Sequence, residues 1–339
     1  MSLPRFALLS MLLSGPAAAQ EVTLRFQHFV NPASANPTYF MQPWADAIEA
    51  QSGGRIAVEI YPFMQLGGAA ANMYDLIADG AVDGGWVIPG YQPGRFPEAE
   101  ALELPFMTPK SAEAASVAAW TFTQDHLMDD FADVQVIAAH MHGPGLVHLK
   151  GDAPEGVAGL RGLNLRGPTR MGTRLLDGLG ANPIGMPVPA FPEALAKGVL
   201  DGGLITWEQS PSLKLDELVD SHTDVAGADA LYNLYFLWAM NRDVYEGLPD
   251  DLRAVIDANS GAMAAAWAGR AHDTGDALGR EIMAASGNQI AELSPEATAE
   301  IRAVGDAVTE AWIAEMAAEG RDGTALVEDA RAAMAAASR

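Results

Sequence analysis

The apolar and polar residues near the start of the chain follow two different periods. Residues 22–29 and 55–61 alternate between apolar and polar side chains, which predicts half-buried strands. Between them, large apolar side chains recur every four residues from Phe40 to Ile48, which predicts an amphipathic helix over 39–51. A strand, a helix and a strand in this order predict a βαβ unit and a partly parallel sheet. Ligands of such sheets lie beyond the carboxyl ends of the strands.

A second pattern occurs twice along the chain. Residues 75–85 and 193–203 each combine a helical stretch, a glycine (Gly80 or Gly198) and an Asp-Gly-Gly sequence that leads into an apolar strand. Glycine just after a helix adopts the left-handed conformation easily, so each glycine predicts a helix end. The repeat predicts two similarly built lobes whose strand ends face each other across a cleft. A chance match between segments rich in alanine and glycine is the alternative.

The last third of the chain has helical composition. We expect helices over 250–285, 295–318 and 325–337, long enough to span both lobes. Three glycines in the first of these stretches are candidate kinks: Gly261, Gly269 and Gly275.

The amino terminus has the three parts of a secretory signal peptide. Arg5 precedes an apolar run over residues 6–13, and small residues end at Ala17-Ala18-Ala19. The run is too short to cross a bilayer. We therefore expect cleavage after Ala19, a periplasmic protein and no insertion into the membrane. A buried amino-terminal helix is the alternative.

Composition narrows the class of protein. The 339 residues contain no cysteine, which excludes disulfides and thiolate chemistry. Twenty Lys and Arg against 44 Asp and Glu give a net charge of −24, which disfavours binding to nucleic acid and to anionic lipid. An anionic ligand therefore needs a local cationic site. With 49% hydrophobic residues and no low-complexity linker, the chain is expected to form two domains joined by a hinge.

Catalytic motifs are missing from the sequence. There is no nucleophile elbow, zinc-protease motif, phosphate-binding loop or dinucleotide fingerprint. His140 and His142 are two residues apart on an expected strand, where they share a face, but no third metal ligand has a recognisable spacing. We therefore predict no enzyme activity, no catalytic residue, no metal site and no cofactor. An enzyme with an unfamiliar fold remains an alternative.

One arginine stands at an expected strand end. In residues 160–168, Leu163 and Leu165 point to one face of a short strand, and Asn164 and Arg166 point to the other. Arg166 then lies at the carboxyl end, where its guanidinium can hold a carboxylate through two parallel hydrogen bonds. The alternative is a surface arginine in an ordinary ion pair.

The sequence resembles the substrate-binding proteins of tripartite ATP-independent periplasmic (TRAP) transporters, specifically those like the dicarboxylate-binding proteins. The likeness extends over nearly the whole mature chain. It includes LRGLNLR at 160–166, which resembles the family's LkGlkiR, and further segments that follow in the family's order: 63–68, 80–83, 96–97, 103–106, 180–183, 186–187, 193–202, 240–241 and 248–249.

This resemblance implies an α/β, two-lobed periplasmic binding protein fold with a central cleft, crossing strands and a long spanning helix. We expect lobe I to comprise residues 20–142 and 229–265 and lobe II residues 143–228 and 266–300, after the signal peptide at 1–19. Helices of residues 301–339 are expected to pack on lobe I. The implied function is extracytoplasmic solute binding, with delivery of a small organic acid to the membrane subunits of the transporter. A ligand-binding partner of a chemosensory system is the alternative.

The resemblance also places the ligand site. Arg166 matches the arginine that binds the ligand carboxylate in most members. Many members have a second arginine in a Gly-(Phe/Tyr)-Arg pattern, but residues 142–148 here contain none. A second buried carboxylate would need its own charged partner, so we favour a monocarboxylate such as a hydroxy or keto acid. A dicarboxylate and a zwitterion are the alternatives.

Further site residues are expected on both sides of the cleft. Trp207 and Glu208 resemble a Pro-Trp-Glu segment of one subgroup, and the tryptophan would form a flat wall unless it packs in the core. The remaining candidates lie at expected strand ends or in a family-like loop: His28, Phe29, Trp86, Tyr91, His142 and Gln65.

Overall fold

The polypeptide folds around two mixed β-sheets, and the computed structural model describes residues 20–338. The expected signal peptide and its cleavage site at Ala19 lie outside the described residues. In spatial order the first sheet contains β2 (Ile56–Tyr61), β1 (Val22–Gln27), β3 (Gly84–Val87), β10 (Tyr235–Asn241) and β4 (Val134–Met141). The second contains β11 (Gln289–Glu292), β9 (Ser221–Asp224), β5 (Gly145–Leu149), β8 (Gly202–Thr206), β6 (Asn164–Gly167) and β7 (Asn182–Gly185).

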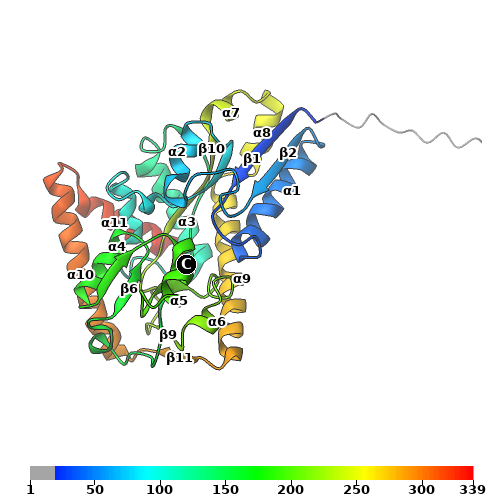
Figure 1. The fold of residues 1–339 in the computed structure, drawn as a ribbon. Helices are drawn as coiled ribbons and strands as arrows, with labels where there is room; N and C mark the ends of the chain where they lie inside the picture. The colour runs from blue at the N-terminus through cyan, green and yellow to red at the C-terminus, as the bar shows by residue number, and fades with distance from the viewer. Residues whose placement is uncertain (1–19, 339) are drawn as a thin grey trace, which may run out of the picture.

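Helices cover both sheets (Figure 1). In chain order they begin with α1 (Gln42–Gln51), α2 (Met73–Ala78), α3 (Ala112–Phe122), α4 (Arg170–Gly178) and α5 (Phe191–Ala196). They continue with α6 (Leu215–Leu218), α7 (Arg242–Glu246), α8 (Asp250–Ala258), α9 (Ala262–Ser286), α10 (Pro295–Ala318) and α11 (Gly323–Ala337). No helix of residues 20–338 combines the length and the apolar character that a membrane crossing requires.

The βαβ unit at the start of the chain is confirmed. β1 and β2 pair in parallel, from Val22 opposite Ile56 to Gln27 opposite Tyr61. The connecting α1 buries Trp44 against Phe26 of β1, with ring centroids 5.3 Å apart. The apolar side chains of the strand and of the helix therefore pack together in one core, as the sequence predicts.

The repeat is also confirmed, with one copy in each sheet. α2 leads through Gly80 into β3 of the first sheet, and α5 leads through Gly198 into β8 of the second. Both glycines have a φ of +71°. This left-handed conformation ends each helix and turns the chain directly into the following strand.

Several segments connect the two halves, so the chain has the predicted two-lobed architecture. The chain crosses from β4 to β5, returns from β9 to β10, crosses again in α9 and returns along α10 to α11, which packs on α3. α9 contacts β4 and α3 on one side and α6 and β11 on the other. Figure 1 shows α9 running along the molecule from the first half to the second.

The glycines near α9 act differently from the sequence expectation. Gly261, with a φ of +80°, separates α8 from α9, whereas Gly269 and Gly275 lie inside an unbroken helix. A Cβ at Gly275 would lie 2.3 Å from the Cβ of Ala35 and 2.8 Å from that of Glu208. These two residues come from opposite halves of the molecule. Gly275 is therefore a position of close approach between the two halves.

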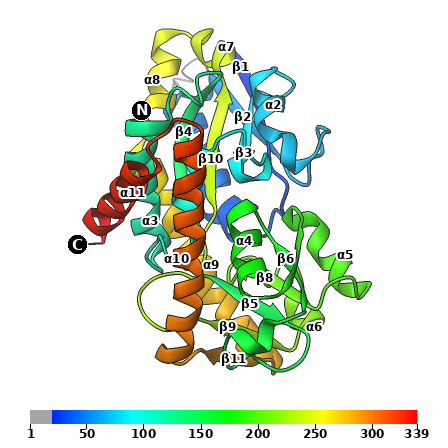
Figure 2. The same ribbon diagram turned by 90° about the vertical axis from the view of Figure 1, so that its left-hand side faces the viewer.

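The carboxy-terminal helices divide between the two halves. α11 packs on α3, but α10 lies along α4, whose strand β6 belongs to the second sheet (Figure 2). Gly178 of α4 permits this contact, because a Cβ there would lie 2.6 Å from Cγ1 of Val304. α10 also contacts the first half, because Nε1 of its Trp312 donates to Oε2 of Glu100 (3.1 Å) and a Cβ at its Gly305 would lie 2.9 Å from Cβ of Pro105. The packing of residues 301–339 on lobe I stays a prediction, as do the other lobe boundaries.

Candidate functional site

A cavity lies between the two sheets, beside the carboxyl ends of β3 and β8. Its empty volume, including its opening, is about 360 Å³. The first sheet and the loops after it contribute Phe29, Val30, Trp86, Ile88 and Tyr91. The second half contributes Arg166, Val188, Ile205, Thr206, Glu208 and Gln209, and the crossing segments contribute His142, Tyr232, Leu234 and Phe236. Both copies of the repeat therefore end at this cavity.

Arg166 is the cation of this cavity. It lies on β6 with 1% of its surface exposed. Its Nε donates to the carbonyl oxygen of Met186 (3.1 Å) and its Nη1 donates to that of Leu204 (2.7 Å). Nη2 is buried and has no hydrogen-bond partner in residues 20–338, and none of their acidic side chains pairs with the guanidinium. A buried guanidinium held in this way is oriented to receive an anion.

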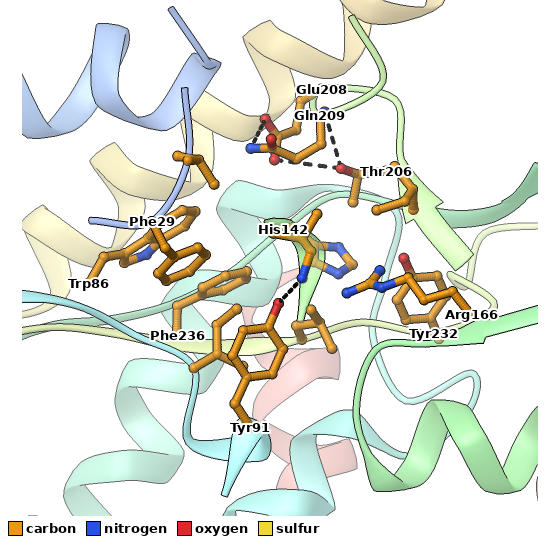
Figure 3. A pocket seen from close by; sticks show the side chains of 15 residues that line it. Phe29, Trp86, Tyr91, His142, Arg166, Thr206, Glu208, Gln209, Tyr232 and Phe236 are labelled. Atoms are coloured by element: carbon orange, nitrogen blue, oxygen red, sulfur yellow. Dashed lines mark hydrogen bonds between the residues drawn. The ribbon is translucent and has the colours of Figure 1, made fainter. Parts of the chain in front are cut away.

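Aromatic rings form one side of the cavity, opposite Arg166 in Figure 3. Trp86 stacks between Phe29 and Phe236, with centroid distances of 5.0 and 4.7 Å and interplanar angles of 4° and 11°. The indole Nε1 of Trp86 donates to Nε2 of His140 (2.9 Å), which fixes the plane of the stack. We call Phe29, Trp86 and Phe236 the aromatic group. It offers flat apolar surface to a ring.

His142 lies between the aromatic group and Arg166 (Figure 3). It is 2% exposed, and burial lowers its pKa to about 3, so the imidazole is neutral at physiological pH. Nδ1 lies 2.6 Å from the carbonyl oxygen of Gly143. Since a carbonyl only accepts, Nδ1 carries the proton and Nε2 is an acceptor. Nε2 is buried and has no partner in the described part of the chain.

Glu208 brings a buried carboxylate to the cavity wall. Its Oε2 accepts from Nε2 of Gln209 (3.1 Å), and its Oε1 lies 3.3 Å from Nδ1 of His272. The backbone N–H of Glu208 donates to Oδ1 of Asp276 (2.9 Å). Burial, followed by the charge of Glu208, raises the pKa of Asp276 well above its usual value. Asp276 therefore holds a proton more readily than an ordinary aspartate.

Tyr91 joins the two halves at the edge of the cavity. The backbone N–H of Val188, which follows β7, donates to the Tyr91 hydroxyl (3.0 Å). Burial raises the pKa of Tyr91, and the positive charge of Arg166 opposes that rise. The phenol is therefore neutral at physiological pH. A second link is Arg170 of α4, which pairs with Glu100 and with Glu315 of α10 (2.8 Å).

Six of the nine sequence-predicted site residues line the cavity: Arg166, Glu208, Phe29, Trp86, Tyr91 and His142. The other three do not. Trp207 is buried behind the wall, where its ring packs on His148 and His222 at centroid distances of 6.1 and 5.5 Å. The core-packing alternative applies to it, because the chain turns after Thr206 and the strand alternation ends there.

His28 and Gln65 also lie outside the lining. His28 is 1% exposed, and its Nδ1 accepts from the backbone N–H of Val30 (3.3 Å), so its ring supports the loop that carries Phe29. Burial lowers its pKa to about 4. Gln65 is on an exposed loop.

Sequence reasoning missed Tyr232 and Phe236, which line the cavity from the return crossing into β10. The dense aromatic content of residues 232–238 was the available signal. Within residues 20–338, no group of three or more His, Asp or Glu side chains is arranged to hold a metal ion. His140 accepts a hydrogen bond from Trp86 and stacks on Phe236 at a centroid distance of 5.0 Å.

Comparison with known proteins gives a consistent result. The family model described as bacterial extracellular solute-binding protein, family 7, matches residues 26–316. A TRAP solute-binding protein from Rhodoferax ferrireducens, in complex with copurified benzoate, is 44% identical, with a TM-score of 0.90 and coverage of 93% of this chain and 98% of that one. A marine metagenome protein specific for aromatic acid ligands, in complex with metahydroxyphenylacetate, is 42% identical, with a TM-score of 0.92 and coverage of 94% and 100%. A third, from Bordetella bronchiseptica with bound mandelate, is 28% identical, with a TM-score of 0.84 and coverage of 92% and 98%.

Proposed function

Because the chain belongs to family 7 of the bacterial extracellular solute-binding proteins, we propose that it is the receptor of a TRAP transporter for an aromatic monocarboxylate. The family consists of receptors for small organic solutes. In this proposal the ligand binds reversibly and leaves unchanged. The receptor acts in the periplasm after removal of residues 1–19 and delivers its ligand to separate membrane subunits.

The observation that carries the proposal is the pairing of Arg166 with the aromatic group in one cavity. The unpartnered Nη2 of Arg166 and the adjacent Tyr91 and Tyr232 hydroxyls favour a carboxylate at one end. The stacked rings of the aromatic group favour a flat apolar body at the other. Pockets of this kind obtain affinity from apolar burial and orientation from a few polar groups.

The absence of a second arginine from the lining supports one carboxylate over two. A second carboxylate would have to face Glu208 or the rings of the aromatic group, and both lack a compensating positive charge. The ligands named for the solved relatives, benzoate, metahydroxyphenylacetate and mandelate, each combine one carboxylate with one ring.

The two halves are expected to close over the ligand by a hinge motion. Tyr91 and Val188 face each other from opposite halves, as do Arg170 and Glu100, so both contacts form when the cleft closes. Closure excludes water from the Arg166 site and strengthens its electrostatic attraction to a carboxylate. The closed form is then the one that the membrane subunits would recognise.

A thermal-shift screen followed by calorimetry tests the proposal. The mature chain is unfolded and refolded to remove carried-over ligand, then titrated with benzoate, phenylacetate, lactate and succinate. We expect the aromatic acids to raise the melting temperature in a concentration-dependent way, since they bind the native state. Mass spectrometry of the recovered ligand should show no chemical change. If succinate raises the melting temperature and neither aromatic acid does, the proposal is wrong.

A further inference from the structure

The cavity has unused hydrogen-bonding capacity of two kinds. The donating capacity lies with Arg166, whose Nη2 has no partner among residues 20–338, and the accepting capacity lies on His142 Nε2 and in the remaining lone pairs of Glu208. Burial raises the pKa of both Tyr91 and Tyr232, and the charge of Arg166 opposes that rise in each case. The two phenols therefore remain protonated beside Arg166 and add donors for the ligand carboxylate.

His142 offers an atom that is restricted to accepting. The Gly143 carbonyl fixes the proton on Nδ1, so Nε2 has a free lone pair and no hydrogen. Its side chain is buried within the lining, and Nε2 has no partner in residues 20–338. If the ligand group that faces Nε2 were also only an acceptor, two lone pairs would face each other with no hydrogen between them.

Glu208 has spare accepting capacity as well. A carboxylate has about four lone-pair sites. The Gln209 amide uses one at 3.1 Å, and the contacts to Thr206 Oγ1 (3.5 Å) and His272 Nδ1 (3.3 Å) are long. The side chain is only 2% exposed, so bulk water does not complete its hydrogen bonding.

We infer that the cavity selects a ligand that carries a hydroxyl group in addition to its carboxylate, and that the single hydroxyl hydrogen is accepted by one of two buried acceptors, His142 Nε2 or the Glu208 carboxylate. The inference rests on the proposed function and narrows its ligand class. A hydroxyl supplies the missing hydrogen, whereas a keto oxygen only accepts. The hydroxy acid is therefore bound, and the keto acid of the same skeleton is discriminated against. His142 and Glu208 become the specificity-determining residues.

The experiment compares acids that differ in one group. Phenylacetate, mandelate, phenylglyoxylate and phenylglycine carry hydrogen, hydroxyl, keto oxygen and ammonium on the same carbon, and benzoate and 3-hydroxybenzoate test a hydroxyl on the ring. Dissociation constants are measured by calorimetry on the refolded mature chain. In at least one of the two series we expect the hydroxy acid to bind about tenfold or more tightly than its partners, the range for a hydrogen bond to a buried acceptor.

Two variants assign the effect to its residues. Glu208→Gln keeps the shape but replaces an accepting oxygen by an amide donor, and His142→Phe keeps a ring but removes the acceptor. At least one should reduce the hydroxyl preference to about threefold or less, while affinity for the unsubstituted acid changes less. Glu193→Gln, at an exposed site on α5, is the matched control and should leave every ratio unchanged.

The possible outcomes separate the two proposals. Aromatic acids that bind without hydroxyl preference in either series, or a preference for phenylglyoxylate or phenylglycine, would overturn the inference and leave the proposed function intact. A hydroxyl preference that persists in both variants would also overturn it. Tight binding of lactate with no binding of any aromatic acid would overturn the proposed function but support selection of a hydroxyl.

Discussion

The two copies of the helix–strand repeat have the same backbone and opposite chemistry. In the first, α2 turns at Gly80 into β3, and the cavity wall contains Trp86 from the strand and Ile88 and Tyr91 from the residues after it. In the second, α5 turns at Gly198 into β8, and the wall contains Thr206 from the strand end and Glu208 and Gln209 from the residues after it. The first copy therefore presents rings and the second presents polar atoms.

The comparison shows that different residues determine the position of a side chain and its chemistry. The glycine turn and the strand set the direction in which the chain reaches the cavity, and they are alike in both copies. The residues after the strand set the chemistry, and they share no pattern. We call the α2–β3 copy the first module and the α5–β8 copy the second module.

The largest expected effect comes from removing Arg166, the cation that donates to the carbonyl oxygen of Leu204 in the second module. Arg166→Ala should weaken binding of an aromatic acid by about 2–5 kcal/mol, since the ligand carboxylate loses a desolvated partner. Calorimetry measures the loss. Arg161→Ala, on the exposed turn before β6, is the control and should bind normally. Unchanged affinity in Arg166→Ala would show that a different residue holds the carboxylate.

The stability of the fold should depend on pH through a buried carboxyl next to Gly90, just after the first module. A Cβ at Gly90 would lie 2.7 Å from Oε2 of Glu103, whose carboxyl is buried, and burial raises the pKa of Glu103 from 4.5 to about 7. Between these two values the folded chain holds a proton that the unfolded chain releases. The stability contributed by this group is therefore complete below about pH 4.5 and is lost as the pH rises to 7.

Glu103→Gln should remove this dependence, because a glutamine remains neutral. At pH 8 the variant should be more stable than the wild type by up to about 3 kcal/mol, and at pH 5 the two should be nearly equal. Urea unfolding at both pH values gives the difference. The same difference at pH 5 and pH 8 would contradict the assignment.

The two turn glycines should respond alike to substitution. Gly80→Ala and Gly198→Ala each place a Cβ in a left-handed conformation at a φ of +71°, which costs about 1–2 kcal/mol. No heavy atom lies within 4 Å of the added Cβ at Gly198, and at Gly80 the nearest is Asn241 Nδ2 at 3.7 Å. Denaturant unfolding should give two similar losses. Losses that differ by more than about twofold would break the equivalence of the modules.

The smallest expected effect concerns the contact between the first module and the second half. Tyr91→Phe removes the hydroxyl that accepts from the Val188 N–H and that is proposed to donate to the ligand carboxylate. Ligand binding should weaken by about 0.5–1.5 kcal/mol for each hydrogen bond lost, with little change in the melting temperature of the free protein. Calorimetry and thermal unfolding measure the two quantities. A large loss of stability with normal affinity would place the role of Tyr91 in folding instead.

Local periodicity was sufficient to predict most elements. The βαβ unit, the repeat and α10 follow from patterns a few residues long, and α10 has the bounds expected, residues 295–318. The site was harder to predict. Arg166 was predicted from its place at an expected strand end together with the family-like segment 160–166. Tyr232 and Phe236 reach the cavity only because a distant segment returns beside β3.

Two adjacent residues show what could not be predicted from the sequence. Trp207 and Glu208 are adjacent, and both were expected at the ligand, but only Glu208 lines the cavity. A Cβ at Gly279 of α9 would lie 2.0 Å from the carbonyl oxygen of Trp207, so the helix holds this turn and determines which side chain faces inward. Such a contact between positions far apart in the sequence has no local signature.

The charge of Arg166, which has no acidic partner among residues 20–338, also bears on the efficiency of transport. Closing the cleft around a guanidinium without an anion leaves a dehydrated charge, which costs several kcal/mol, and each 1.4 kcal/mol lowers a population tenfold. On this account the proposed receptor would be open in nearly all molecules that carry no ligand. The membrane subunits proposed above would then meet few closed, unloaded receptors. Arg166, proposed to hold the ligand carboxylate, would thus also keep unloaded receptors from docking.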